Sequence, residues 1–542
     1  MMKNIFKIDM KSSKLVYIPV LVFLMVFSSC EKNIDLQPFN QVSETAAFQT
    51  PALVALSVAG MYEAAQIGYY ANPVSPAYRG YPFGAAFVTQ GDNRGEDVVN
   101  TATFYQLTYT ATYSTSSANN VNYWKDSYRL INRCNIVIDG VKTAATNKII
   151  TDAQAAIYAG EARLLRAMTY HELLVNFSRP YKDTPAASHM GVPYFDQPFT
   201  TAAAIAAGFA TGRSTVAEVY TKILADLDYA EANLPLKAAM TGNAKITRAT
   251  KGAAVAEKTR IYLHMWNMDK VIEEGTKFIS GTLAGTYALT ADPSGPFMSP
   301  YSNTESIFGM ENSANQNPGV NAALAQMYAP SSIGGRGLVT MSPIIWRLPT
   351  WLLDDKRRAD GAMITKVADV KGGSVIYTNK YKDPVNKTDP SPMLRYGEVI
   401  MNMAEAYARK GDVTNGLAYL NMIRNRALAT PASQAFTASS FATNVALLGA
   451  ILDERRIEFV MEGRRWPDIH RLQQCPYFPV SGIPAKLANG MPAGSLFTLG
   501  TPYTGALGTT AVPYSDFRFV WPIPQDEINA NPTLAKQQNP GW

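Results

Sequence analysis

The sequence predicts a mainly α-helical protein whose helices pack in pairs, together with a second, irregular half that shows no regular periodicity. Apolar residues recur every three or four positions in many segments, and short polar turns join several of these segments in twos. Long stretches rich in Gly, Pro and Asn lie between them. The chain has 542 residues, 47% hydrophobic and 17% charged, which is typical of a folded globular protein.

The helices are expected in a definite order along the chain. The first covers residues 48–66, where Pro51 stands near the start, in the turn whose N–H groups have no intrahelical partner. Thr215 and Glu218 form a capping-box pattern at the start of the segment 214–234. The other helical segments are 121–142, 151–177, two runs within 249–279, 393–409, 414–428 and 444–462.

The clearest helix pair is the segment 394–427. Small residues stand where the two helices would touch, and Lys410-Gly411-Asp412 forms the turn, with Gly411 suited to a left-handed cap. This segment resembles one tetratricopeptide (TPR) unit. The pairs at 249–279 and at 121–142 with 151–177 have the same layout, so the helices are expected to form an α-α superhelical scaffold in which neighbours bury each other's apolar faces.

Three stretches break this pattern, at residues 67–120, 281–347 and 473–520. Loops of this length within a compact domain are usually functional or disordered. Their aromatic content argues against disorder. We therefore expect a large loop-rich half that carries the ligand-binding surface.

The N-terminus predicts a lipoprotein signal peptide. A lysine-rich start precedes the apolar run Leu15–Phe27, which is too short to span a bilayer as a helix but suits a signal peptide. Ser28 and Ser29 then lead into Cys30, as in a bacterial lipobox, so residues 1–29 are expected to be cleaved and Cys30 acylated. The alternative is an ordinary secretory signal with a cysteine near its cleavage site.

Composition excludes several functions. The net charge of +6 falls to about +3 once residues 1–29, with four lysines and one aspartate, are removed, and no basic block indicates nucleic-acid binding. No second apolar run approaches a membrane span. The histidines lack metal-ligand spacing, so no zinc or non-haem iron site is expected, and we expect no cofactor. Cys134 is expected to be a buried apolar residue. Whether Cys134 and Cys475 form a disulfide cannot be decided from their spacing in the sequence.

No motif predicts catalysis. The sequence has no nucleophile elbow, zinc-protease motif or phosphate-binding loop. The charged stretch 454–472 is expected to form salt bridges along a helix face, with Gly463 ending the helix. The run Gly334–Gly337, which includes Arg336, is expected to be a turn rather than an anion cradle. The oxygen ligands of Asp92, Glu96 and Asp97 leave calcium open as a minor alternative, although their spacing does not match an EF-hand.

Four segments together resemble the SusD/RagB family of nutrient-binding lipoproteins: GDNRGEDVVN at 91–100, GEARLLRAMTYHELLVNFSRPYKDTP at 160–185, ERRIEFVMEGRRWPDIHRL at 454–472, and the end from WPIP at 521–542. No single motif is decisive, but their order covers essentially the whole chain after the signal. Pro467 departs from the family pattern, where an aromatic residue is commoner.

This resemblance implies a single SusD-like domain at 30–542. Its N-terminal region would span about 31–235 and its C-terminal region about 280–542. It also implies a localisation: the protein would be held by its lipid anchor on the outer face of the outer membrane. The implied partner is a SusC-like TonB-dependent transporter, which would receive the ligand. The family implies no catalytic role, and we expect the protein not to be an enzyme.

The loop 67–120 supplies the candidate ligand-binding residues, because sugar rings stack on aromatic faces and bind polar side chains through their hydroxyls. Any single aromatic residue here is more simply explained as packing the loop onto the helices, whereas the group is expected to form a ligand surface. The candidates are Tyr78, Tyr81, Arg94, Phe104, Tyr105, Tyr109 and Tyr113.

The ligand class stays open at this point. A glycan is expected first, and a peptide is the alternative, favoured by an arginine cluster or acid pair in the cleft. A surface hydrolase would need two carboxylates at a defined separation, and nothing in the sequence points to them. A bare TPR adaptor that binds another protein is a further alternative.

Overall fold

The computed structural model describes residues 46–68, 78–299 and 301–542. The signal peptide and Cys30 therefore lie outside the described residues. Within the described part, helices dominate and the few strands are short, which confirms the mainly α-helical class. No helix of the described part is long and apolar enough to cross a bilayer.

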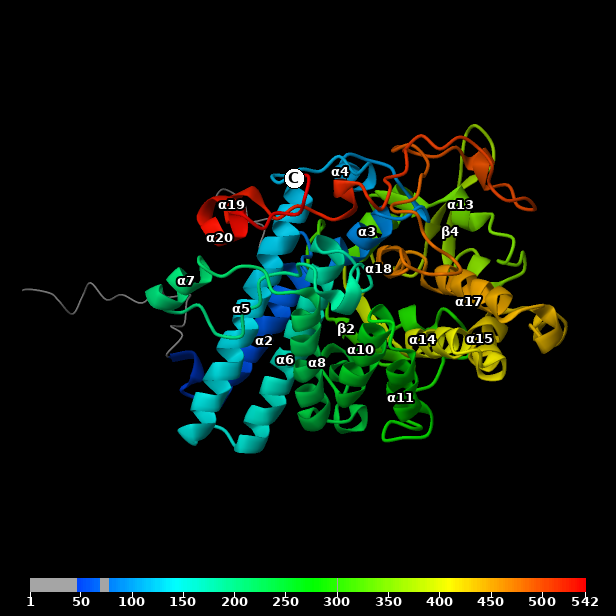
Figure 1. Cartoon of the computed structure of the whole chain (residues 1–542). Helices are drawn as coiled ribbons and strands as arrows, with labels where there is room; N and C mark the ends of the chain where they lie inside the picture. The colour runs from blue at the N-terminus through cyan, green and yellow to red at the C-terminus, as the bar shows by residue number, and fades with distance from the viewer. Residues whose placement is uncertain (1–45, 69–77, 300) are drawn as a thin grey trace, which may run out of the picture.

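A row of helices forms the scaffold, each packed on the next along the chain (Figure 1). Helix α2 lies against the first long helix of the row, and the last helix packs on both members of the pair before it. The members are α2 (Pro51–Ile67), α5 (Ala118–Thr146), α6 (Asp152–Phe177), α8 (Val216–Asn233), α10 (Lys251–His264), α11 (Met268–Ile279), α14 (Tyr396–Arg409), α15 (Val413–Ala427) and α17 (Asn444–Phe459). Every helix expected from the sequence is present, with its ends shifted by a few residues.

Local capping explains where several of these helices begin. The side chain of Thr215 accepts a hydrogen bond from the backbone N–H of Glu218, whose carboxylate accepts one in return from the backbone N–H of Thr215, so the predicted capping box is confirmed. Thr50 and Thr151 cap α2 and α6 through their hydroxyl groups. Between α14 and α15, Gly411 has φ of +85°, the left-handed turn that favours glycine.

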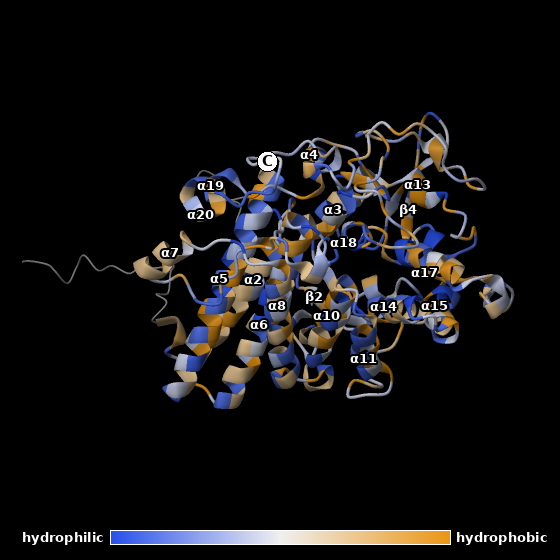
Figure 2. Cartoon of the chain, in the orientation of Figure 1, coloured by the Kyte–Doolittle hydropathy of each residue, from blue (hydrophilic) through white to orange (hydrophobic). Residues whose placement is uncertain are grey.

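The predicted TPR-like pair is confirmed in its packing. Gly416 of α15 faces α14 so closely that a Cβ atom there would lie 3.3 Å from the backbone nitrogen of Ala408. Small residues at this crossing let the two helix backbones approach each other. Polar and apolar residues alternate around the scaffold helices, as expected for helices with one buried face (Figure 2).

The loop-rich half lies along one side of this row (Figure 1). Its strands pair as three two-stranded antiparallel sheets within the described residues: β1 (Val98–Asn100) with β3 (Val339–Met341), β2 (Ser306–Met310) with β6 (Ser391–Arg395), and β4 (Ile364–Ala368) with β5 (Ser374–Thr378). The strands were not predicted. In runs of three to five residues, the alternation of apolar and polar residues is too short to distinguish a strand from a loop.

Short helices lie within the loops of this half and within the loops that connect the scaffold helices. They are α3 (Ala85–Asn93), α4 (Gln106–Tyr109), α7 (Ala202–Gly208), α9 (Ala244–Thr247), α12 (Leu324–Tyr328), α13 (Pro343–Trp346), α16 (Pro431–Gln434), α18 (Arg465–Arg471), α19 (Gln525–Ala530) and α20 (Pro532–Ala535). Helices α19 and α20 return to the N-terminal end of the row, near α5 and α7 (Figure 1).

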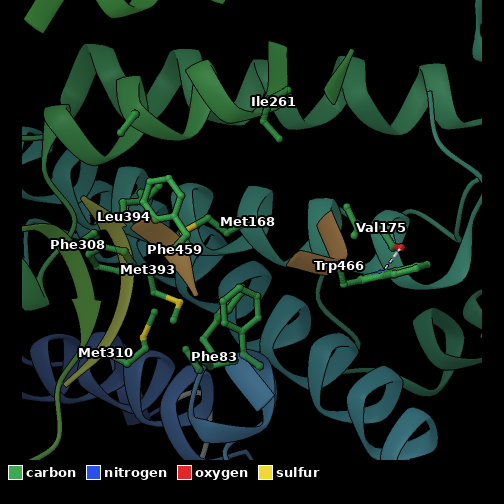
Figure 3. Close-up of a cluster of buried hydrophobic side chains, with 14 of the residues drawn as sticks. Phe83, Met168, Val175, Ile261, Phe308, Met310, Met393, Leu394, Phe459 and Trp466 are labelled. Carbon is green, nitrogen blue, oxygen red and sulfur yellow. Dashed lines mark hydrogen bonds between the residues drawn. The ribbon is translucent and has the colours of Figure 1, made fainter. Parts of the chain in front are cut away.

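One continuous apolar core joins the two halves (Figure 3). Met168 of the scaffold, Phe83 of the loop 67–120 and Phe308 of β2 all belong to it. Trp466 of α18 is 1% exposed and donates a hydrogen bond from its indole nitrogen to the Val175 carbonyl at 3.1 Å, which anchors the 454–472 segment to α6. The irregular half therefore shares one buried core with the helices.

Candidate ligand-binding face

Five of the seven candidate residues lie in the core rather than on a ligand face. Their side chains are between 0% and 4% exposed: Tyr81, Arg94, Tyr105, Tyr109 and Tyr113. The interpretation of these five as ligand contacts is therefore wrong for this structure. Each buries a large ring or guanidinium group against the protein itself, which leaves no face for a ligand.

The buried tyrosines tie the loop to distant parts of the chain. Tyr109 donates a hydrogen bond to the carbonyl of Leu487 at 2.8 Å, and Tyr113 donates one to the carbonyl of Arg518. Tyr81 donates to the side chain of Asn119 at 3.2 Å. Irregular backbone has few internal hydrogen bonds, so aromatic anchors with a polar tip can hold such a loop in place.

Arg94 is a buried cation held between aromatic rings. Its guanidinium carbon lies 3.3 Å from the ring centroid of Trp466 and 5.0 Å from that of Trp521. It donates hydrogen bonds to the Asn176 side chain and the Phe519 carbonyl. Burial lowers the pKa of Arg94 to about 10, so the cation–π contacts and these oxygens hold its charge. Its function is structural.

Two segments that carried the family resemblance, 91–100 and 454–472, pack directly on each other. A Cβ atom on Gly91 would lie 2.4 Å from the carbonyl oxygen of Gly463, so only glycine allows this approach. The backbone N–H of Gly463 donates to the Asp92 carboxylate at 2.9 Å. Burial raises the pKa of Asp92 to about 7.

The acidic residues after Asp92 pair with arginines of the same junction. Glu96 lies 2.5 Å from Arg465, and Asp97 pairs with Arg456. In the part of the chain that the structure describes, no group of three His, Cys, Asp or Glu residues could hold a metal ion. The carboxylates of this cluster are engaged by arginines and backbone, which argues against the calcium alternative.

The charged stretch 454–472 forms ion pairs, as expected, but not along an exposed helix face. Glu458 is 3% exposed and contacts Arg357, Arg395 and Arg426 at 2.9, 2.7 and 2.5 Å. Arg471 likewise pairs with Glu405 of α14 at 2.7 Å. These pairs join separate elements in the interior, because the face of α17 that carries Glu454, Arg455 and Glu458 is buried, as is nearly all of α18.

Perturbed acid–base groups can mark catalytic sites, but Lys486 and His470, whose pKa values are both lowered, lie in the interior. Burial lowers the pKa of Lys486 to about 7, yet this side chain is 1% exposed and its ammonium group donates to the carbonyls of Asn93 and Gly95. His470 is 2% exposed and bonds the Ser178 carbonyl at 2.9 Å. These groups have structural partners and no solvent access.

Phe104 is the candidate that remains partly exposed and is surrounded by polar side chains. Its partly buried ring packs edge-on against Tyr105, with centroids 4.8 Å apart. The guanidinium carbons of Arg79 and Arg336 lie 4.6 and 5.1 Å from its centroid. Arg336 also donates to the Asn321 side chain at 2.7 Å. We call Arg79, Phe104, Asn321 and Arg336 the Phe104 patch.

Strand pairing explains why the patch assembles from distant segments. Strand β1 pairs with β3, so the loop after Asn100 runs beside the loop before Val339. The Thr101 hydroxyl donates to the Gly337 carbonyl at 2.7 Å and fixes this register. The run Gly334–Gly337 is the expected turn, and it presents Arg336 to Phe104. Sequence reasoning missed Asn321, because nothing local marks it.

Tyr78 is 39% exposed but lies elsewhere, on a groove between α2 and α5. The candidates therefore divide into five core residues and two surface residues at different places. Cys30 lies outside the described residues. Cys134 and Cys475 are both buried and free, so they do not form the disulfide that the sequence left open.

The comparisons with known proteins cover most of the chain. Residues 35–263 match a family model described as "Starch-binding associating with outer membrane", and residues 352–542 match the model of the SusD family. SusD-like protein P2 of Formosa agariphila is 25% identical over 518 residues, which are 86% of this chain and 91% of that protein. SusD-like protein P25 of the same organism is 26% identical over 305 residues, 55% of this chain and 52% of P25.

Solved structures share the fold. A SusD superfamily protein from Bacteroides fragilis aligns with a TM-score of 0.72 at 24% identity, covering 90% of this chain and 99% of that one. A SusD-like carbohydrate binding protein from Bacteroides vulgatus aligns with a TM-score of 0.69 at 21% identity, and the alignment covers 90% of this chain and 98% of that one. At this identity the structural likeness establishes the architecture alone.

Proposed function

Because this chain is a SusD-like family protein, we propose that it binds carbohydrate at the outer membrane and passes it to a SusC-like TonB-dependent transporter. The observation that carries the proposal is the match of residues 35–263 to a family described as starch-binding and associated with the outer membrane. The proposal assigns binding and no catalysis.

The Phe104 patch is where we place the ligand. A partly buried ring with two guanidinium groups over it and an amide beside them brings apolar carbon and polar groups together, the usual design of a small-molecule site. Sugar hydroxyls can accept hydrogen bonds from the guanidinium groups, and the exposed part of the ring can contact the C–H groups of a pyranose. This placement replaces the larger aromatic surface expected from the sequence.

A peptide stays the second candidate ligand, and one observation favours it. Two arginines at one site suit carboxylates, which peptides carry at their C-terminus and on acidic side chains. A carboxylated or sulfated glycan would meet the same donors. A titration that compares neutral glycans, acidic glycans and peptides separates these cases.

We also propose that a lipid on Cys30 anchors the protein to the outer membrane. Replacing Cys30 with serine tests this anchor. Acylation needs the Cys30 thiol, so the variant is expected to lose its lipid and to leave the membrane fraction when cells are fractionated. The wild-type protein is expected in the outer-membrane fraction, accessible to protease added outside the cell. Ser29→Ala keeps a small residue before the cysteine and serves as control. A Cys30→Ser protein that stays in the membrane fraction contradicts the lipid anchor.

A further inference from the structure

A second pocket lies at the N-terminal end of the helix row, where α5, α7 and the C-terminal helices α19 and α20 meet (Figure 1). Its volume is about 260 Å³. A water molecule occupies about 30 Å³ of liquid, so the pocket has room for several waters or for one side chain. The pocket shares no residue with the Phe104 patch, and the proposed carbohydrate binding makes no use of it.

Aromatic rings wall this pocket and are fixed before any ligand arrives. The ring centroids of Trp124 and Tyr128 are 4.8 Å apart, those of Tyr128 and Phe195 5.7 Å, and those of Phe195 and Phe199 4.9 Å. The Tyr128 hydroxyl donates to the Pro193 carbonyl at 2.8 Å. Phe209, which is 50% exposed, stands at the rim and leaves the mouth open.

Glu527 is the acidic residue that lines this pocket, and its charge acts on Tyr128 of the aromatic wall. Among the described residues its carboxylate oxygens have no hydrogen-bond or ion-pair partner, and Glu527 bonds only through its backbone. The nearby Lys125 pairs instead with the exposed Asp526 at 2.6 Å. Burial raises the pKa of Glu527, and the charge of the nearby Lys125 offsets this only in part.

The other polar groups around the pocket are already engaged. Asn531 donates its side-chain amide to the Thr211 carbonyl at 2.7 Å. Arg213, which lies near Tyr128, donates to the carbonyls of Gly191 and Gln537 at 2.7 and 2.8 Å. Glu527 is thus the one group at this pocket that still lacks a complement among the described side chains.

We propose that this pocket binds the side chain of a lysine or arginine displayed by a partner polypeptide. The aromatic faces attract a cation and cover its apolar stem, and the Glu527 carboxylate pairs with its head. Either side chain is small enough for a pocket of this volume. A folded element would not fit, so the partner inserts one residue and contacts the rim with its neighbours.

The test uses blocked amino acids as probes and saturation-transfer NMR on the purified protein from residue 31. Acetyl-arginine amide and acetyl-lysine amide are titrated beside their uncharged counterparts, acetyl-citrulline amide and acetyl-norleucine amide. We expect saturable, millimolar binding of at least one cationic probe, at least about five times tighter than its uncharged counterpart. Glu527→Gln is expected to remove this preference.

Glu273→Gln is the control for loss of an acid elsewhere. Glu273 is exposed and does not line the pocket, so the cationic preference is expected to persist. Phe199→Ala removes a wall ring and is expected to weaken both kinds of probe. Equal binding of charged and uncharged probes, a preference that survives Glu527→Gln, or no saturable binding up to about 20 mM would each overturn the proposal. Glycan binding at the Phe104 patch is measured separately, so the two proposals fail independently.

Discussion

Replacing Glu458 by glutamine is expected to lower the free energy of unfolding by about 3 to 5 kcal/mol, enough to threaten folding in many domains. Burial alone would raise the pKa of Glu458, but the guanidinium groups of Arg426, Arg395 and Arg357 hold it well below its usual value. The variant keeps the shape of the side chain and leaves three buried guanidinium groups with less negative charge. Chemical denaturation followed by circular dichroism measures the change.

Glu273→Gln is the matched control for this prediction. Glu273 also forms an ion pair on a helix, with Lys270 at 2.8 Å, but its side chain is 54% exposed. Exposed pairs contribute about 0 to 1 kcal/mol, so the control is expected to unfold close to wild type. If Glu458→Gln lowered the free energy of unfolding no more than Glu273→Gln does, the buried ion pairs would not stabilise the junction between α15, α17 and β6.

Replacing Phe104 by alanine is expected to weaken ligand binding at least about tenfold, with the fold unchanged. Aromatic residues that anchor a binding site commonly contribute more than 1 to 2 kcal/mol, and tenfold corresponds to 1.4 kcal/mol. The ring also organises Arg79 and Arg336, so its loss disperses the donors as well as the apolar face. Calorimetric titration with the ligand that wild type binds measures the effect.

Two variants make this result specific. Phe104→Trp keeps an aromatic face and is expected to bind within about threefold of wild type. Tyr477→Ala removes an aromatic residue of a different loop, 54% exposed, and is expected to bind as wild type does. Unchanged affinity in Phe104→Ala, with the thermal midpoint preserved, would move the ligand away from the Phe104 patch.

The helical half of the fold was predictable because its signals are local. Thr215 and Glu218 lie three residues apart and define the start of α8, and Gly411 defines the turn between α14 and α15. The strands of the other half pair across long separations, such as Val98 with Met341. Such pairing leaves almost no mark in a run of three residues.

The ligand face was less predictable, because tyrosines that anchor a loop and tyrosines that bind a ligand have the same composition. Tyr109 reaches Leu487, 378 residues away, and only that contact shows that its ring is buried. Arg94 looked like a ligand donor in sequence, yet Trp466 and Trp521 enclose it. Phe104 differs from these residues only in what the fold places beside it.

The central claim is that this chain captures carbohydrate, and titration calorimetry tests it most directly. Purified protein from residue 31 is titrated with neutral polysaccharides, acidic polysaccharides and a peptide mixture under one set of conditions. The account predicts saturable heat with at least one glycan class, reduced at least about tenfold in affinity by Phe104→Ala. Saturable binding of peptides alone, or of none of the three, would contradict it.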